Sequence, residues 1–68
     1  MHNRHKFAIG QRIAYIKPDN LPAVGATGSI EGLLRNSRYL VRFDQPIGTD
    51  NADNPVTMMT CNESSLVA

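Results

Sequence analysis

The six residues from Arg38 to Phe43 alternate strictly between two kinds of side chain. One set is aromatic or β-branched and consists of Tyr39, Val41 and Phe43. The set between them consists of Arg38, Leu40 and Arg42. Because successive side chains of a strand point to opposite faces of its sheet, the alternation predicts a strand over 38–43 with its aromatic face in the core.

Glycine, proline and asparagine break the rest of the chain into short segments. Strands are expected at 11–17, 25–34 and 56–61, with a short helical turn at 62–65 and an extended end at 66–68. Gly25, Gly28 and Gly32 predict bulges or sharp bends in the second strand. No amphipathic helix of about ten residues fits the sequence. The expected fold is all-β: a five-stranded, strongly bent antiparallel SH3-like barrel with one short 3-10 turn near the C-terminus.

A chain of 68 residues has room for one hydrophobic core. We expect a flexible basic N-terminal arm over residues 1–6 and a single barrel domain over 7–68. Loops are expected at 18–26 and at 44–55, and a polar hairpin turn at 35–38 in which Asn36 takes the left-handed conformation. The predicted core consists of Ile13, Tyr15, Ile30, Tyr39, Val41, Phe43 and Leu66.

The single cysteine, Cys61, excludes an internal disulfide framework and favours the reducing cytoplasm. No apolar run approaches the roughly 18 residues that a membrane span needs, and the first six residues do not follow the pattern of a signal peptide. We therefore expect a cytoplasmic protein that has no membrane partner.

Charge is distributed unevenly along the chain, although the net charge is only +1. Residues 1–42 hold all seven Lys and Arg side chains and two acids, whereas residues 43–68 hold four acids and no base. Since both halves share one core, this asymmetry predicts two differently charged parts of one surface. The alternative is that scattered bases only keep a small sheet soluble.

Catalytic and metal-binding patterns are weak. His2, His5 and Cys61 do not form the three or four converging ligands of a metal site, so no metal or other cofactor is expected. Cys61 has no base near it in sequence, and apart from Glu31 the acids fall in predicted loops or turns. We therefore expect that the protein is not an enzyme.

The basic residues of the predicted hairpin give the one candidate site. Arg38 and Arg42 share a strand face, and a basic stripe of this kind can bind phosphates or a partner's acids. The predicted partner-binding residues are Lys17, Arg35, Arg38, Leu40 and Arg42. The competing interpretation is that outward charges on an edge strand prevent aggregation.

The order Gly10-x-x-Ile13-x-Tyr15, Gly25-x-x-Gly28-x-Ile30, Tyr39-x-Val41-x-Phe43 and finally Leu66 resembles the SH3-like small barrels over residues 10–67. Within that group it is similar to the KOW domains of ribosomal and transcription factors and to the small stromal subunit of photosystem I. KOW domains bind RNA or protein, and the photosystem subunit helps a soluble electron carrier to dock. The resemblance therefore implies a docking module.

We expect a non-catalytic module that docks on a larger protein or nucleoprotein assembly as an accessory or regulatory subunit. One alternative is a KOW-like protein that binds RNA or DNA. Another is an oligomeric enzyme built from small barrels, similar to the type II dihydrofolate reductases. The Val-Gln-Ile-Tyr strand of those reductases would fall at 56–59, where this chain has Val-Thr-Met-Met. The oligomeric state stays open.

Overall fold

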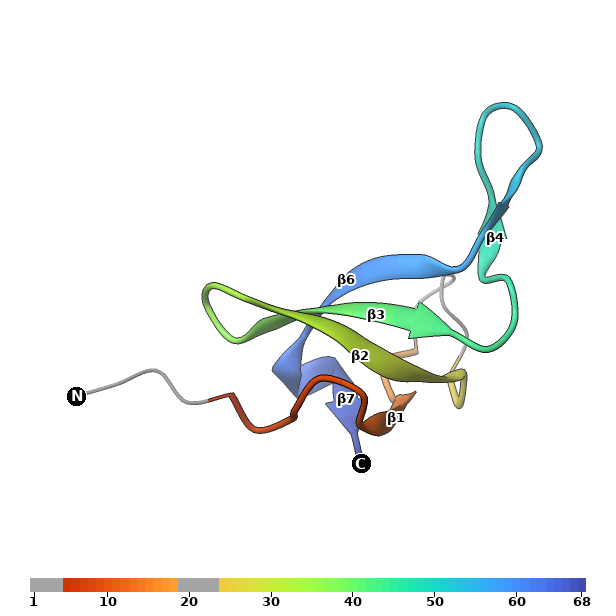
Figure 1. The fold of residues 1–68 in the computed structure, drawn as a ribbon. Coiled ribbons are helices and arrows are strands. Elements are labelled where there is room, and N and C mark those ends of the chain that lie inside the picture. The colour runs from red at the N-terminus through yellow and green to blue at the C-terminus, as the bar shows by residue number, and fades with distance from the viewer. Residues whose placement is uncertain (1–4, 19–23) are drawn as a thin grey trace.

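The computed structural model describes residues 5–18 and 24–68 of the chain, and these residues form an all-β fold (Figure 1). The strands are β1 Arg12–Tyr15, β2 Thr27–Leu34, β3 Arg38–Phe43, β4 Gly48–Thr49, β5 Pro55–Val56, β6 Met58–Asn62 and β7 Leu66–Val67. A 3-10 turn, η1 Glu63–Ser65, joins β6 to β7. The predicted all-β class and the turn near the C-terminus are confirmed. No helix in the described part of the chain is long and apolar enough to cross a membrane.

Five strands form one antiparallel sheet in the order β6-β3-β2-β1-β7. The C-terminal strand returns to the first one, where Tyr15 pairs with Leu66. In the described residues β6 and β7 are the two edges and do not pair with each other, so the sheet is not closed into a barrel. The three residues of η1 carry the chain from one edge to the other without a ladder between them.

Glycines allow β2 to bend against β3, as the sequence predicts. The register between the two strands shifts between Ile30 and Gly32, which makes Glu31 the extra residue of a bulge. At Gly28 the strands approach so closely that a Cβ atom would lie 2.8 Å from the Cα atom of Phe43. A side chain does not fit there, and only glycine permits this crossing.

The core contains every residue that the sequence assigned to it. Phe7 and Cys61 are buried in it as well. The aromatic rings meet edge to face, with centroids 5.4 Å apart for Phe7 and Tyr39 and 6.4 Å apart for Tyr15 and Phe43. The segment before β1 therefore contributes a ring to the core.

The predicted N-terminal arm lies largely outside the described residues, which begin at His5. The two described arm residues contact the domain. His5 Nε2 lies 2.7 Å from the carbonyl oxygen of Leu34, and the backbone N–H of Lys6 donates to Glu63 over 3.0 Å. The described end of the arm therefore lies against the hairpin end of the sheet.

The predicted loop over 44–55 is partly structured, which corrects that prediction. Its ends pair as β4 and β5, which form a two-stranded ribbon (Figure 1). Asp50 organises the turn, because its Oδ1 accepts hydrogen bonds from the N–H groups of Ala52 and Asn54. Such a ribbon cannot be recognised from sequence composition, because each of its strands is only two residues long. In the other predicted loop, 18–26, residues 19–23 lie outside the described part of the chain.

Candidate functional site

The outer face of β3 carries three of the five predicted partner-binding residues. Arg38, Leu40 and Arg42 follow one another on this face, while the residues between them are buried. Their β2 partners are Leu34, Gly32 and Ser29, and their β6 partners are Asn62, Thr60 and Met58. The face is therefore a mixed surface in which an apolar side chain lies between two guanidinium groups.

Arg42 is engaged within the chain. Its Nε donates to Oε2 of Glu31 over 3.0 Å, and both side chains are exposed. Glu31 reaches Arg42 because it lies two residues beyond Ser29, the β2 partner of Arg42, on the same face. An exposed pair of this kind stabilises a fold by about 1 kcal/mol or less, so a partner's acid can displace Glu31 at little cost.

A second ion pair occupies the same face at β1, and no spacing in the sequence indicates it. Both terminal nitrogens of Arg12 donate to the carboxylate of Asp44, and Thr27 Oγ1 donates to the same carboxylate over 2.7 Å. These donors, with Arg12 first and Thr27 second, lower the pKa of Asp44 from 3.8 to about 2. Asp44 therefore stays charged and neutralises Arg12.

The tip of the β2–β3 hairpin is the most distinctive exposed segment. Leu33 and Leu34 end β2 with 42% and 37% of their surface exposed. Arg35 and Arg38 flank the turn, are exposed, and have no ion pair in the described part of the chain. Figure 1 shows this tip projecting away from the body of the sheet. It presents apolar surface and available guanidinium groups together.

The geometry of the turn fixes how those side chains are presented. Asn36 and Ser37 both adopt left-handed backbone conformations, with φ of 61° and 57°. The left-handed conformation predicted for Asn36 is confirmed, whereas that of Ser37 was not foreseen, because serine seldom adopts it. The carbonyl of Ser37 accepts a hydrogen bond from the N–H of Glu63 over 2.8 Å, which ties the tip to η1.

Lys17 does not join this surface. It follows β1, whose Ala14 pairs with Thr27 at the start of β2, whereas the hairpin tip begins at the far end of β2 after Leu34. At about 3.3 Å per residue, β2 separates these two ends by roughly 23 Å. The structure therefore brings together Arg35, Arg38 and Leu40, leaves Arg42 paired, and places Lys17 elsewhere.

The described residues contain no group of three His, Cys, Asp or Glu side chains that could hold a metal ion. Cys61 is buried in the core, and burial raises the pKa of its thiol to about 11. The thiolate is the reactive form of cysteine, so this side chain is a poor nucleophile at neutral pH.

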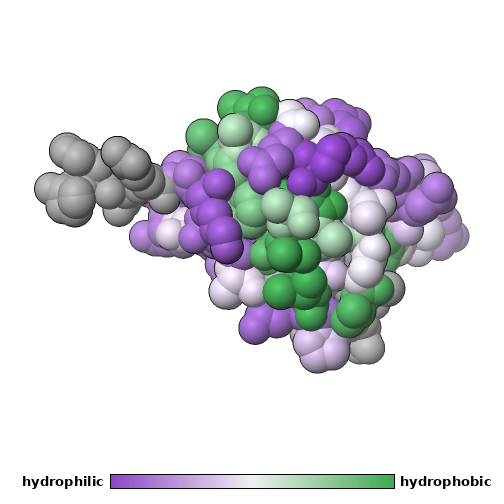
Figure 2. Space-filling model, turned by 90° about the horizontal axis from the view of Figure 1, so that it is seen from below, coloured by the Kyte–Doolittle hydropathy of each residue, from purple (hydrophilic) through white to green (hydrophobic). Residues whose placement is uncertain are grey.

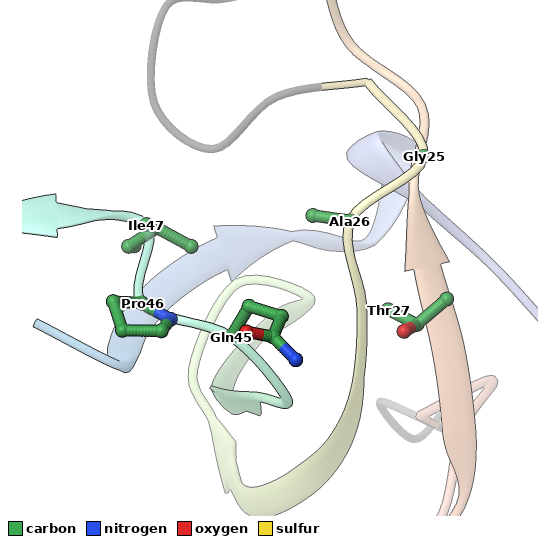
Figure 3. A pocket seen from close by; sticks show the side chains of 6 residues that line it. All are labelled: Gly25, Ala26, Thr27, Gln45, Pro46 and Ile47. Carbon is green, nitrogen blue, oxygen red and sulfur yellow. The ribbon is translucent and has the colours of Figure 1, made fainter.

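Among the residues that the structure describes, two hollows lie away from the hairpin tip. One, of about 280 Å³, lies between the start of β2 and the segment after β3, and six residues line it: Gly25, Ala26, Thr27, Gln45, Pro46 and Ile47 (Figure 3). None of these side chains is ionisable. The other, of about 260 Å³, lies beside Arg12, whose guanidinium is already bound to Asp44. Neither hollow assembles groups for acid–base chemistry.

No protein-family model matches this chain, and no curated protein or solved structure matches it either. The resemblance to SH3-like barrels therefore stays a prediction.

Proposed function

We propose that this chain is a non-catalytic docking module that binds a larger protein assembly as an accessory or regulatory subunit. The docking surface is the β2–β3 hairpin tip together with the outer face of β3. The observation that carries the proposal is the mixed outer face of the hairpin. Exposed Leu34 lies opposite Arg38 on this face, and Leu40 follows on the same strand face. Arg35 and Arg38 have no ion pair in the described residues. Protein interfaces favour an apolar centre flanked by arginine.

The strand order supports an SH3-like small barrel as the scaffold of this module. The first strand lies between β2 and the C-terminal strand, and a 3-10 turn separates β6 from β7. Cys61 of one edge strand and Leu66 of the other are buried in the same core. This shared core supports a sheet that bends until its two edges approach each other.

A protein partner fits the surface better than a nucleic acid does. Of the arginines on the outer face, Arg12 and Arg42 are neutralised by Asp44 and Glu31. All four Phe and Tyr side chains of the chain are buried in the core, so none offers a platform on which a base could stack. Two arginines without an ion pair in residues 5–18 and 24–68, with a net charge of +1 for the chain, give little attraction for a polyanion.

We propose a non-catalytic role because the reactive side chains are either buried or held by hydrogen bonds. The thiol of Cys61 is buried with a raised pKa, and the carboxylates of Asp44 and Glu63 are held by hydrogen bonds to neighbouring side chains. We place the module in the cytoplasm, because domains without an internal disulfide are typical of reducing compartments.

Affinity capture from the native host, with mass spectrometry of what is retained, tests the proposal. Wild-type protein is compared with Leu34→Glu, which puts a charge into the apolar tip, and with Ile16→Glu. Ile16 is a matched control because it is an equally apolar residue, 48% exposed, that lies beyond β1 and away from the tip. We expect one partner that wild type and Ile16→Glu retain and that Leu34→Glu loses.

A titration with mixed DNA and RNA at low and moderate salt separates the two partner classes. The proposal predicts no binding at moderate salt. If Arg35 and Arg38 instead contact phosphates, affinity falls with salt with a log–log slope of about −2 on duplex DNA. Micromolar binding with such a slope would replace the protein partner by a nucleic acid.

A further inference from the structure

Strand β6 lies at an edge of the sheet, and half of its backbone groups point away from the neighbouring strand. Phe43 donates its N–H to the carbonyl of Thr57 over 2.7 Å, and Glu63 donates its N–H to Ser37 over 2.8 Å. Odd-numbered residues therefore face β3. The N–H and C=O groups of Met58, Thr60 and Asn62 face outward, and no strand in the described residues pairs with them.

This edge lacks the features that usually protect a strand from pairing with another chain. The segment 56–62, Val-Thr-Met-Met-Thr-Cys-Asn, contains no charge and no proline. The β3–β6 register runs without a bulge, and Thr60 and Asn62 are exposed. Natural edge strands are ordinarily protected by lysine, proline, bulges or short length. The other edge, β7, is only two residues long.

We infer that β6 pairs with the β6 strand of a second copy of this chain. The outward-facing residues 58, 60 and 62 are arranged symmetrically about Thr60. An antiparallel two-fold arrangement therefore places Thr60 opposite Thr60 of the partner subunit, and Met58 opposite Asn62 of the partner subunit. Each of these opposed pairs is a hydrogen-bonded pair, in which the two residues exchange two backbone hydrogen bonds. Every outward N–H and C=O of the strand therefore has a partner.

Self-complementarity and charge select a second copy as the occupant. No like charges meet in this register, because the nearest charged residue, Glu63, lies opposite Thr57 of the partner subunit. Arg38 is in register with Asn62, and Arg42 with Met58, on the far side of β6. Arg38 of one subunit and Arg42 of the partner subunit are therefore separated by three inter-strand spacings. At about 4.8 Å per spacing this distance is roughly 14 Å, which exceeds the screening length of physiological salt.

The pairing also has a consequence for docking. Opposed residues of an antiparallel pair point to the same face, and Thr60 shares its face with Leu40. The two outer β3 faces therefore lie on one side of a shared sheet. This inference does not depend on the proposed function, since the edge is formed by backbone groups that the docking surface does not use.

Sedimentation velocity between about 10 µM and about 1 mM covers the affinity expected of so small a contact. The wild type is expected to pass from monomer to dimer in this range. Thr60→Pro removes one inter-copy hydrogen bond from each subunit but none from the monomer's own ladder, so it should raise the dissociation constant about tenfold or more. Thr60→Lys, which places like charges face to face, provides a second disruptive variant.

Thr60→Val is the matched control, because it keeps the backbone donor and a β-branched side chain, and it should dimerise like the wild type. Circular dichroism verifies that each variant is folded. Amide exchange supplies a second measurement: the N–H groups of Thr60 and Asn62 should be protected only in the dimer. A wild type that stays monomeric throughout, or a dimer that both disruptive variants leave intact, would overturn the inference. Slow amide exchange of Thr60 and Asn62 that appears only when a different protein is added would also overturn the inference.

Discussion

The hydroxyl of Tyr39 donates a hydrogen bond of 2.6 Å to Oε2 of Glu63 and joins three separate parts of the chain. The same hydroxyl accepts the N–H of Phe7 over 3.1 Å, and the same carboxylate oxygen accepts the N–H of Lys6 over 3.0 Å. Tyr39 is fully buried on β3, Glu63 begins η1, and the two donors belong to the segment before β1. This contact holds the N-terminal segment over the core behind the hairpin tip.

Replacing Tyr39 with phenylalanine should therefore destabilise the protein. The change removes a hydrogen bond to a charged group and leaves the buried N–H of Phe7 without its acceptor, which costs about 1 to 3 kcal/mol. Urea unfolding measures the loss. Glu63→Gln, which keeps an acceptor for the hydroxyl, should cost less. A Tyr39→Phe variant as stable as the wild type would show that this contact contributes nothing.

Acid should weaken the fold partly through Asp44. Because hydrogen bonds from Arg12 and Thr27 lower its folded pKa from 3.8 to about 2, its contribution is fully present above pH 3.8. The contribution disappears as the pH falls from 3.8 towards 2. Unfolding free energies measured across this window should fall less steeply in Asp44→Asn than in the wild type. Asp53→Asn is the control, since that carboxylate has no side-chain hydrogen bond in the described residues, and identical slopes for wild type and Asp44→Asn would refute the assignment.

Gly28 and Gly32 lie on the same strand but should respond differently to alanine. A Cβ atom at Gly28 would collide with the backbone of Arg42 and Phe43, whereas at Gly32 it would make an ordinary 3.5 Å contact with Leu40. Gly28→Ala should cost about 1 to 3 kcal/mol or more, because the β2–β3 crossing has to open. Thermal unfolding compares the two variants. Equal melting temperatures would mean that β2 does not approach β3 as closely as described.

The strands and the core could be predicted from sequence because both follow local rules. Alternation along β3 identified Tyr39, Val41 and Phe43 as core residues, and glycine spacing predicted the bend in β2. The burial of Phe7 could not be predicted, because the residues before it are polar without periodicity and its burial depends on the distant ring of Tyr39.

The candidate site was predictable only in part. Arg38 and Leu40 share a face because they are two residues apart on one strand. The pairing of Arg42 with Glu31 depends on the register between β2 and β3, and that of Arg12 with Asp44 depends on the sheet order. Sequence spacing encodes neither. Leu33 and Leu34 resemble core residues in sequence, and their exposure follows from the extension of the hairpin beyond the core (Figure 1).

The turn at the hairpin tip offers a stabilising substitution. Ser37 has a φ of 57°, a conformation that costs an L-residue about 1 to 2 kcal/mol and glycine almost nothing. After the extra entropy that glycine loses on folding, Ser37→Gly should stabilise the protein by about 0.5 to 1 kcal/mol. Chemical denaturation measures this difference. Ser37→Ala keeps the Cβ atom and should not stabilise; a glycine variant no more stable than alanine would contradict the strained turn.

Apolar side chains also gather on the underside of the molecule, which Figure 2 shows. This apolar surface is an alternative docking site for a protein partner. Among the exposed apolar residues away from the hairpin tip are Ile16, which follows β1, and Val67 of β7. A charged substitution at Leu40 tests the docking surface, and a charged substitution at Ile16 tests the apolar surface beside β1.

The affinity of the captured partner for immobilised wild type, Leu40→Glu and Ile16→Glu, measured at low and high salt, tests the docking proposal most directly. The proposal predicts that Leu40→Glu loses the complex at both salt concentrations, because it places a charge between Arg38 and Arg42 at the apolar centre of the interface. Ile16→Glu should bind as the wild type does, with association slowed by salt to the same extent. Unchanged binding by Leu40→Glu, together with loss of binding by Ile16→Glu, would contradict the proposal and move the docking site to the surface around Ile16.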